Sequence, residues 1–212
     1  MVQTRRNRFG VDILRRVGVR VGFVLAWTCA ALGAQADTTL VLFRHGEKPA
    51  QGLGQLSCQG LNRALALPGV LVAQFGTPQA LYAPNPGVTA MDRGTPYHYI
   101  RPLATIEPTA IRLGLPVNTT WGLTSLNEVG AELLSPAHRG QTLFVAWEHH
   151  LLVRLTRALV AEGQGDPTTV PDWPDDDFDT IFVVRIPLSG PARFERSREG
   201  LDGLSSTCPG AG

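Results

Sequence analysis

The apolar positions of the chain follow two different spacings, which alternate along residues 38–199. Continuous runs of β-branched and aromatic residues at 38–43 and 142–148 predict strands that are buried on both faces. Apolar residues at helical spacing predict helices over 101–113 and 150–161. Further elements are predicted as strands at 80–83, 117–121, 179–187 and 192–199, and as helices at 58–75 and 127–134. The alternation predicts an α/β fold, a three-layer α/β/α sandwich with helices on both faces of a mixed, mostly parallel sheet.

Residues that cap helices or form turns refine these elements. Ser57 is placed to cap the helix over 58–75, whereas Pro68 and Gly69 predict a break or a kink inside it. The last two predicted strands are separated by a short Ser-Gly-Pro turn and predict a terminal antiparallel pair.

A long segment, residues 84–100, is predicted to be a loop rich in Pro, Gly and aromatic residues. Loops of this length are usually functional or disordered. Tyr97, His98 and Tyr99 stand just before Arg101, which leaves two hypotheses, a lid that selects the substrate and surface packing. We favour a wall of the substrate site.

The composition is that of an ordinary globular protein. The chain has 212 residues, of which 43% are hydrophobic and 17% are charged, with a net charge of +1. This length suits one well-cored domain. The near-neutral balance carries no electrostatic footprint for nucleic acid, so no nucleic-acid partner is expected.

The first 36 residues differ from the rest. A basic stretch is followed by a short apolar segment and by Ala34-Gln35-Ala36, the pattern of a secretory signal peptide cleaved after Ala36. The alternative is an uncleaved anchor, but the apolar run is shorter than the ~20 residues that a spanning helix needs. We therefore expect a signal peptide at 1–36, a single domain at 37–212, a periplasmic or secreted protein, and no stable membrane anchor after cleavage.

Export changes the interpretation of the cysteines. Beyond residue 36 the chain has two, Cys58 and Cys208. In an oxidising compartment such a pair is expected to form a disulfide, which in the chain-entropy account stabilises the fold by ~3–5 kcal/mol. The alternative is two unpaired buried thiols. Two cysteines without a CxxC pair are too few for a zinc site.

Two of the predicted strands run directly into histidines. The strand at 38–43 is followed by Arg44, His45 and Gly46, and the strand at 142–148 by His149 and His150. If both strands lie centrally in one parallel sheet, their carboxyl ends are neighbours and the polar residues face one crevice. Two of only five histidines at equivalent strand exits favour a shared site.

An Arg–His–His cluster suits a phosphoryl dianion. A guanidinium presents a planar fork to phosphate oxygens. A neutral imidazole can attack phosphorus and carry the phosphoryl group. A second donor or cation stabilises the charge that develops on the equatorial oxygens.

The residues at these positions resemble a known family. Arg44-His45-Gly46 after an apolar strand resembles the RHG signature of the histidine phosphatase superfamily, whose fold is phosphoglycerate-mutase-like. Three later blocks are similar to segments of the same family, in the same order: LSCQGLNRAL (56–65), RPLATIEPTA (101–110) and FVAWEHHLLVRL (144–155).

The resemblance implies a role for each matched residue. His45 would be the nucleophile that becomes phosphorylated, and Arg44 and Arg101 would hold the phosphoryl oxygens as substrate-binding residues. His149 would stabilise the transferring group. Arg101 has the alternative role of a helix cap or an ion-pair partner, and His150 would only be a neighbour at the start of the helix.

The proton donor to the leaving group must be a carboxylic acid that reaches the ester oxygen. The resemblance favours Glu128, because SLNE (125–128) is similar to the Leu-Asn-Glu context of mutase-like members, although the following VGAELL departs from it. Glu47, Glu107 and Glu148 stay open as alternatives, as does the absence of any acid. Glu148 is disfavoured because strand alternation would turn it away from His149.

Together these features predict an exported, metal-independent phosphatase that hydrolyses a phosphomonoester through a phosphohistidine on His45. No metal and no cofactor are implied. The expected partner is a small phosphorylated substrate, for which a phosphorylated envelope saccharide is one candidate. The alternative function is a non-catalytic phosphate- or phosphosugar-binding protein of the same fold. A purely structural envelope protein would leave the Arg and His residues without a shared explanation.

Overall fold

A computed structural model describes residues 36–210 of the chain. The predicted signal peptide therefore lies outside the described residues, apart from its last residue, Ala36. Within 36–210 no helix is long and apolar enough to cross a membrane.

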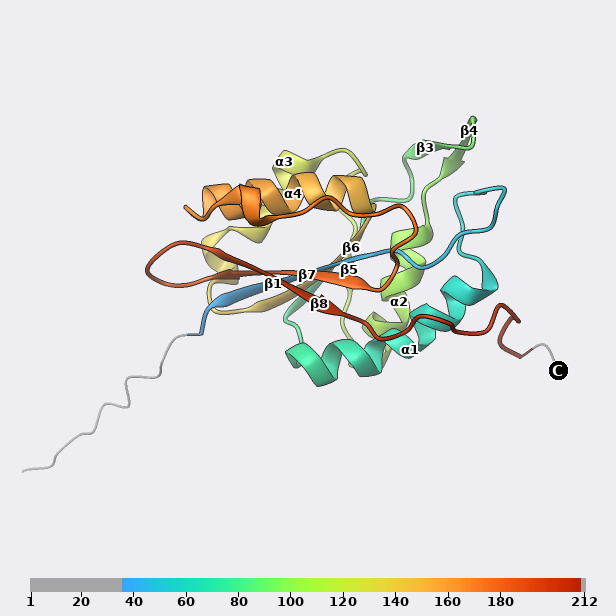
Figure 1. Ribbon diagram of the computed structural model, residues 1–212, viewed down its shortest axis with the longest axis horizontal. Coiled ribbons are helices and arrows are strands. Elements are labelled where there is room, and N and C mark those ends of the chain that lie inside the picture. The colour runs from blue at the N-terminus through green and yellow to red at the C-terminus, as the bar shows by residue number, and fades with distance from the viewer. Residues whose placement is uncertain (1–35, 211–212) are drawn as a thin grey trace, which may run out of the picture. The chain divides into compact units, whose positions relative to one another are not determined.

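Six strands form the central sheet, in the order β5-β2-β6-β1-β7-β8 (Figure 1). The neighbouring pairs β5–β2, β2–β6 and β6–β1 are parallel, whereas β7 is antiparallel to both β1 and β8. The strands are β1 (Thr38–Arg44), β2 (Ala80–Tyr82), β5 (Val117–Asn118), β6 (Thr142–Trp147), β7 (Thr180–Ile186) and β8 (Arg193–Arg198). The predicted mixed sheet and its terminal antiparallel pair are confirmed.

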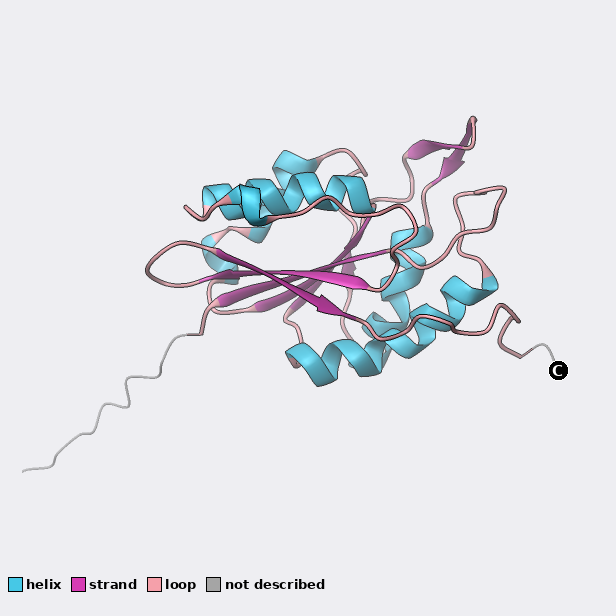
Figure 2. Cartoon of the chain, viewed as in Figure 1, coloured by secondary structure: helices cyan, strands magenta, loops and turns pink. Residues whose placement is uncertain are grey.

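Two pairs of helices cover the two faces of this sheet, as Figure 2 shows. One face carries α3 (Leu126–Leu133) and α4 (His149–Glu162), and the other carries α1 (Cys58–Phe75) and α2 (Arg101–Leu113). Two short 3-10 turns lie at Pro136–His138 and Pro167–Thr169. The predicted three-layer α/β/α architecture is confirmed.

The strand β1 is buried along its whole length because both of its faces are covered. Leu40 and Leu42 pack into the core under α3 and α4, and Val41 and Phe43 pack into the core over α1 and α2. This explains why its sequence is continuously apolar rather than alternating. The polar residues that follow this apolar run therefore lie at the middle of the carboxyl edge of the sheet.

The helix α1 runs unbroken through Pro68 and Gly69, so the predicted break is wrong. Pro68 is itself buried in the helix face that packs on the sheet, and this tertiary packing outweighs the backbone hydrogen bond that a proline removes. The predicted cap is confirmed, since Ser57 Oγ accepts a hydrogen bond from the Gly60 N–H at 3.2 Å.

The segment 84–100 is not wholly a loop. It contains a two-stranded hairpin of β3 (Thr89–Asp92) and β4 (Thr95–His98), separate from the main sheet. These strands are short and mostly exposed, so they carry no apolar alternation that a sequence pattern could detect.

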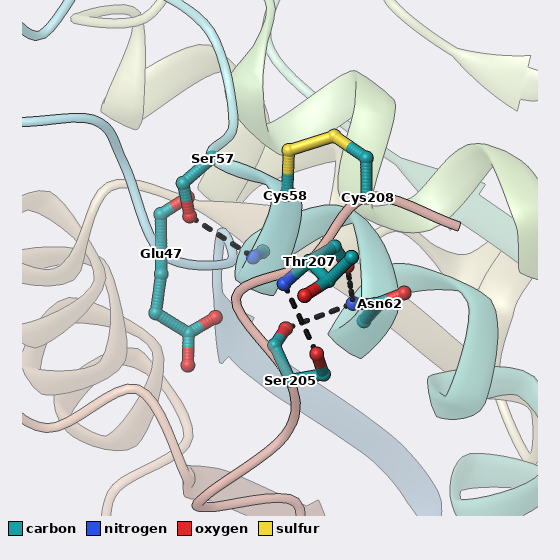
Figure 3. Close-up of a disulfide and its surroundings, with 8 residues drawn as sticks. Glu47, Ser57, Cys58, Asn62, Ser205, Thr207 and Cys208 are labelled. Carbon is teal, nitrogen blue, oxygen red and sulfur yellow. Dashed lines mark hydrogen bonds between the residues drawn. A yellow bond between two sulfur atoms is a disulfide. The ribbon is translucent and has the colours of Figure 1, made fainter. Parts of the chain in front are cut away.

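A disulfide between Cys58 and Cys208 joins the start of α1 to the C-terminal tail (Figure 3), as predicted. Its Cα atoms are 4.6 Å apart and the two residues are separated by 150 positions. The tail is also held to α1 by Asn62, whose side-chain amide donates to the Ser205 and Thr207 carbonyls at 2.8 and 2.9 Å. The tail is therefore part of the packed domain.

Reduction of this disulfide is expected to lower the free energy of unfolding by about 3–5 kcal/mol, because the unfolded chain regains the entropy of a long closed loop. Urea unfolding of the oxidised and the reduced protein would measure the difference. Equal midpoints and slopes for the two forms would contradict the prediction.

A buried cluster of charge lies beside the disulfide-linked tail. The Arg63 guanidinium contacts Glu199 at 2.6 Å, Glu47 at 2.7 Å, Asp202 at 3.2 Å and Asp179 at 3.5 Å. Burial lowers the pKa of Arg63, but its carboxylate partners outweigh this and raise it, so Arg63 stays charged. Asp179 also contacts Arg198 at 3.6 Å, so two cations face four acids and do not neutralise them all. Burial, opposed by Arg63 but supported by Asp179 and Glu47, raises the pKa of Glu199 to about 8.

This cluster makes stability depend on pH. The unfolded glutamate releases its proton near pH 4.5 and the folded one near pH 8. Relative to Glu199→Gln, the wild-type free energy of unfolding is therefore expected to fall by roughly 2–4 kcal/mol as pH rises between these values, and to be level above pH 8. Denaturant unfolding of both proteins from pH 4 to 9 would show it. Glu195→Gln, at an exposed site, serves as the control, and parallel pH curves for wild type and Glu199→Gln would refute the assignment.

Candidate active site

The neighbouring strands β1 and β6 bring the two histidine-containing segments together. Their parallel register pairs Arg44 with Trp147, the last residues of the two strands. The His45 N–H donates to the Trp147 carbonyl at 3.1 Å, so the pairing continues one step beyond the strands. The expectation that both strands lie centrally and side by side is confirmed.

The loop after β1 is fixed by close backbone contacts. The Gly46 N–H donates to Thr105 Oγ1 on α2 at 2.9 Å. A Cβ on Gly46 would lie 2.8 Å from the Gly60 carbonyl oxygen, and a Cβ on Gly60 would lie 2.3 Å from the Glu47 carbonyl oxygen. Both positions therefore require glycine, since the loop lies against the first turn of α1.

Four predicted site residues, Arg44, His45, Arg101 and His149, line one cavity of about 560 Å³ at the carboxyl edge of β1 and β6. The remaining lining residues are Lys48, Ala90, Met91, Asp92, Arg93, Tyr99, Leu123, Glu148, His150, Leu151 and Asp175. The hairpin β3–β4, the loop after β1 and the start of α4 all contribute to the wall.

His45 is buried and has a defined tautomer. Its Nδ1 lies 2.8 Å from the Gly46 carbonyl oxygen, which can only accept, so Nδ1 carries the proton and Nε2 carries the lone pair. Burial lowers the pKa of His45 well below 6.5, and the charges of Arg101 and Arg44 lower it further. The Tyr99 ring meets the imidazole edge-on, with centroids 5.8 Å apart. The result is a neutral imidazole with a free nitrogen.

Arg44 is held by backbone carbonyls rather than by a carboxylate. Its Nη1 donates to the carbonyls of Asp175 and Asp177 at 2.7 and 2.9 Å, and its guanidinium lies over the Phe178 ring at 3.8 Å. Its buried Nε has no hydrogen-bond partner. The charge of Arg44 is thus not cancelled by a bonded acid.

Arg101 opens α2 and is held by the hairpin. Its Nη1 donates to Asp92 Oδ2, and both residues are buried. Tyr99 packs on the guanidinium, 4.3 Å from its centre. Asp92 also accepts the Gly54 N–H at 3.2 Å. The Nε of Arg101, like that of Arg44, is buried without a hydrogen-bond partner.

His149 begins α4 and has a carboxylate at each ring nitrogen. Its Nε2 lies 2.8 Å from Asp175 Oδ1, and its Nδ1 lies 2.7 Å from Glu148 Oε1, although the latter pair is not in hydrogen-bonding orientation. Burial raises the pKa of Glu148, but His149 and the backbone N–H groups of Leu151 and His150 outweigh it and lower this pKa to about 2. Glu148 is therefore ionised.

The predicted proton donor, Glu128, is not among the residues that line this cavity. It is exposed on the first turn of α3, whose buried residues are Val129 and Leu133. Strand alternation does not apply to Glu148, because β6 ends at Trp147, one residue before it. Glu148 lines the cavity and caps α4.

Of the other residues that the sequence suggested for this site, some line the cavity and others do not. Tyr99 lines the cavity, whereas Tyr97 and His98 do not, and the His98 ring is bonded to the Pro86 carbonyl at 2.8 Å. Glu47 is bonded to Arg63, and Glu107 is exposed.

Sequence reasoning missed several residues of the site. Asp92 and Arg93 lie in the unpredicted hairpin, and Asp175 and Phe178 lie in the loop before β7. None has a neighbouring pattern that points to a site. Only the Arg-Gly step after Asp92 was a weak turn signal.

Three adjacent residues could together hold a metal ion. Ligand atoms of Glu148, His149 and His150 lie within 4.8 Å of one another, and carboxylate and imidazole together suit Zn²⁺. Asp175 lies 3.1 Å from His150 Nε2 as well as beside His149. The expected absence of a metal and of a cofactor stays a prediction.

Comparisons with known proteins agree with this architecture. No protein-family model and no curated sequence matches the chain significantly. The structure of the protein histidine phosphatase SixA complexed with tungstate does match, with a TM-score of 0.52 over 76% of this chain and 97% of that one. The chain has the histidine phosphatase fold.

Other structures with the histidine phosphatase fold agree. A SixA structure from Nakamurella multipartitia has a TM-score of 0.51 and 16% identity, and covers 76% of this chain and 96% of that one. Phosphoglycerate mutase from Plasmodium falciparum has a TM-score of 0.50 and 11% identity, and covers 76% and 89%. The tungstate complex is 19% identical to this chain. At these identities the likeness establishes the fold.

The buried pair of Asp92 and Arg101 yields a prediction for this fold. Asp92→Asn leaves a buried guanidinium without its counter-charge, so the free energy of unfolding is expected to fall by about 2–3 kcal/mol, somewhat less than for a fully buried pair because the cavity is open to solvent. Denaturant unfolding would measure the loss. Asp172→Asn removes an exposed partner of Arg157 and is expected to change nothing measurable. Equal effects of the two substitutions would contradict the role given to Asp92.

Proposed function

We propose that this protein is a phosphatase of the histidine phosphatase superfamily, which hydrolyses a phosphomonoester through a phosphohistidine on His45. The observation that carries the proposal is the state of His45, a neutral imidazole with a free Nε2 in a cavity that Arg44 and Arg101 also line. Each arginine keeps a buried Nε without a partner in the structure. Because both arginines line the cavity, their guanidinium groups can donate to phosphoryl oxygens there.

The proposed reaction has two displacements. In the first, His45 Nε2 attacks phosphorus, the P–N bond forms, and the P–O bond to the leaving group breaks. Arg44 and Arg101 bind the non-bridging oxygens, and His149 stabilises the charge that develops on them. In the second, water attacks phosphorus, the P–N bond breaks, and phosphate and neutral His45 are restored as the water gives up a proton.

The first displacement also needs a donor that gives a proton to the oxygen of the leaving group. The cavity's three carboxylates, Asp92, Glu148 and Asp175, all have a lowered pKa and are ionised at neutral pH. Glu128 stays a prediction as proton donor, and its exposed position on α3 does not support it. Substrates whose leaving group needs little protonation, such as aryl phosphates, fit this site best.

A second function has support from the same observation. A cavity that binds a phosphoryl group but has no protonated acid would suit a phosphate- or phosphosugar-binding protein without turnover. The neutral His45 distinguishes the two functions in the phosphatase's favour, because binding alone gains nothing from a free nucleophilic nitrogen beside two cations.

The proposed setting is the periplasm or the exterior. The disulfide between Cys58 and Cys208 supports an oxidising compartment. The substrate would be a small phosphorylated molecule, with a phosphorylated envelope saccharide as one candidate. Among the solved structures with this fold, one is named a protein histidine phosphatase and another a phosphoglycerate mutase, both classes that handle phosphoryl groups.

The test is hydrolysis of 4-nitrophenyl phosphate. His45→Ala removes the nucleophile and is expected to reduce kcat at least ~1000-fold, because the P–N bond of the proposed intermediate can no longer form. Phosphate release by both proteins gives the ratio, and acid-quenched mass spectrometry of the wild type is expected to show a phosphoryl adduct on the peptide that contains His45.

His98→Ala is the matched control, because His98 is exposed outside the cavity. It is expected to retain full activity. Activity that survives in His45→Ala would overturn the mechanism. Tight phosphate binding by the wild type with neither turnover nor adduct would favour the binding protein.

A further inference from the structure

Two cations of the cavity take no part in the proposed chemistry. Lys48 lies in the loop after β1, and Arg93 lies in the turn of the hairpin β3–β4. Both line the same cavity as His45. Within residues 36–210 neither forms an ion pair or a side-chain hydrogen bond, so their charges are not already occupied.

Arg93 occupies a position that its own backbone disfavours. The hairpin turn has two residues, Arg93 with φ 52° and Gly94 with φ 84°, as a type I′ turn requires. Asn, Asp or Gly is preferred at the first of these positions, and an arginine there is strained. Backbone strain of this kind persists at functional sites. There a residue is kept for what its side chain does, and not for how well it fits the turn.

Lys48 is the only lysine of the chain; the other 18 basic residues are arginines. It is partly buried beside Arg101, Arg44 and Arg93, with Asp92 as the acid near it. Asp92 is already bonded to Arg101. The hairpin side of the cavity therefore has a surplus of positive charge.

The other side of the cavity has the opposite character. The remaining carboxylates of the wall, Glu148 and Asp175, both contact His149. A ligand with two negative groups would be repelled there and attracted toward the hairpin.

We propose that Lys48 and Arg93 form an outer anion subsite, which binds a second negatively charged group of the substrate while Arg44 and Arg101 hold the phosphoryl group. The substrate class is then a phosphomonoester that carries a further carboxylate or phosphate. This inference rests on the proposed function only in that it calls the ligand a substrate. The subsite itself concerns binding and can be tested without turnover.

The test compares non-hydrolysable ligands by calorimetry: benzylphosphonate, 3-carboxybenzylphosphonate, and the same ring with a second phosphonate. The wild type is expected to bind each doubly anionic ligand about tenfold more tightly than benzylphosphonate, the gain of one charge-assisted contact. The two doubly anionic ligands show whether carboxylate or phosphate fits better.

Arg93→Asn removes the charge and places a favoured residue in the turn. Its Tm is expected to be no lower than that of the wild type, while the preference for doubly anionic ligands falls to about threefold or less, with Lys48 still present. Lys48→Met is expected to reduce the preference similarly. Arg196→Asn, the same change at an exposed position of β8, is the control and is expected to retain the wild-type preference.

The outcomes separate the two proposals. Equal affinity of the wild type for all three ligands, or an unchanged preference in Arg93→Asn, overturns the subsite whether or not the protein is a phosphatase. A preference that depends on Arg93, in a protein that hydrolyses no phosphomonoester, supports the subsite and contradicts the phosphatase. As a second readout, amine acylation at Lys48 is expected to be slowed by the doubly anionic ligands more than by benzylphosphonate.

Discussion

The parallel pairing of β1 with β6 is the constraint on which the candidate site depends. It ends both strands at the same edge of the sheet, so that His45 and His149, each shortly after its strand, line the same cavity. Both strands are almost wholly buried, and a shift of one residue would exchange the side chains that pack toward α3 and α4 with those that pack toward α1 and α2. The packing that stabilises the sheet therefore also sets the relative position of the two imidazoles.

The cations around the cavity differ in how they are held, and this difference bears on the tasks proposed for them. Arg44 is fixed by backbone carbonyls, and Arg101 by the buried carboxylate of Asp92. Inner donors held in this way lose little freedom when they bind an anion. Lys48 and Arg93 have no such partner within the described residues, so they can adjust to a ligand group of variable position. The inner pair suits an invariant phosphoryl group, and the outer pair suits the part of a substrate that confers specificity.

The loop that carries His45 is supported from behind by the far end of the chain. Glu47, two residues after His45, is bonded to Arg63, and the same guanidinium holds Glu199 at the end of β8. The disulfide at Cys58 secures the C-terminal tail beside them. Segments about 150 residues apart in the sequence thus stabilise one turn of backbone. Glu47, which the sequence offered only as an alternative proton donor, therefore supports this loop through its bond to Arg63.

The sequence by itself determined the parts of this protein that depend on local periodicity and on contiguous residues. The buried strand before Arg44, the helix that begins at Arg101 and the capped helix after Ser57 are all legible there, because apolar spacing and caps are local properties. Only the tertiary structure decided which charges meet. Asp92 lies in a short polar hairpin and contacts Arg101, whereas Glu128 is exposed on α3. Lys48 and Arg93 line one cavity from separate loops. Such placements depend on long-range packing, which leaves no periodic pattern in the sequence.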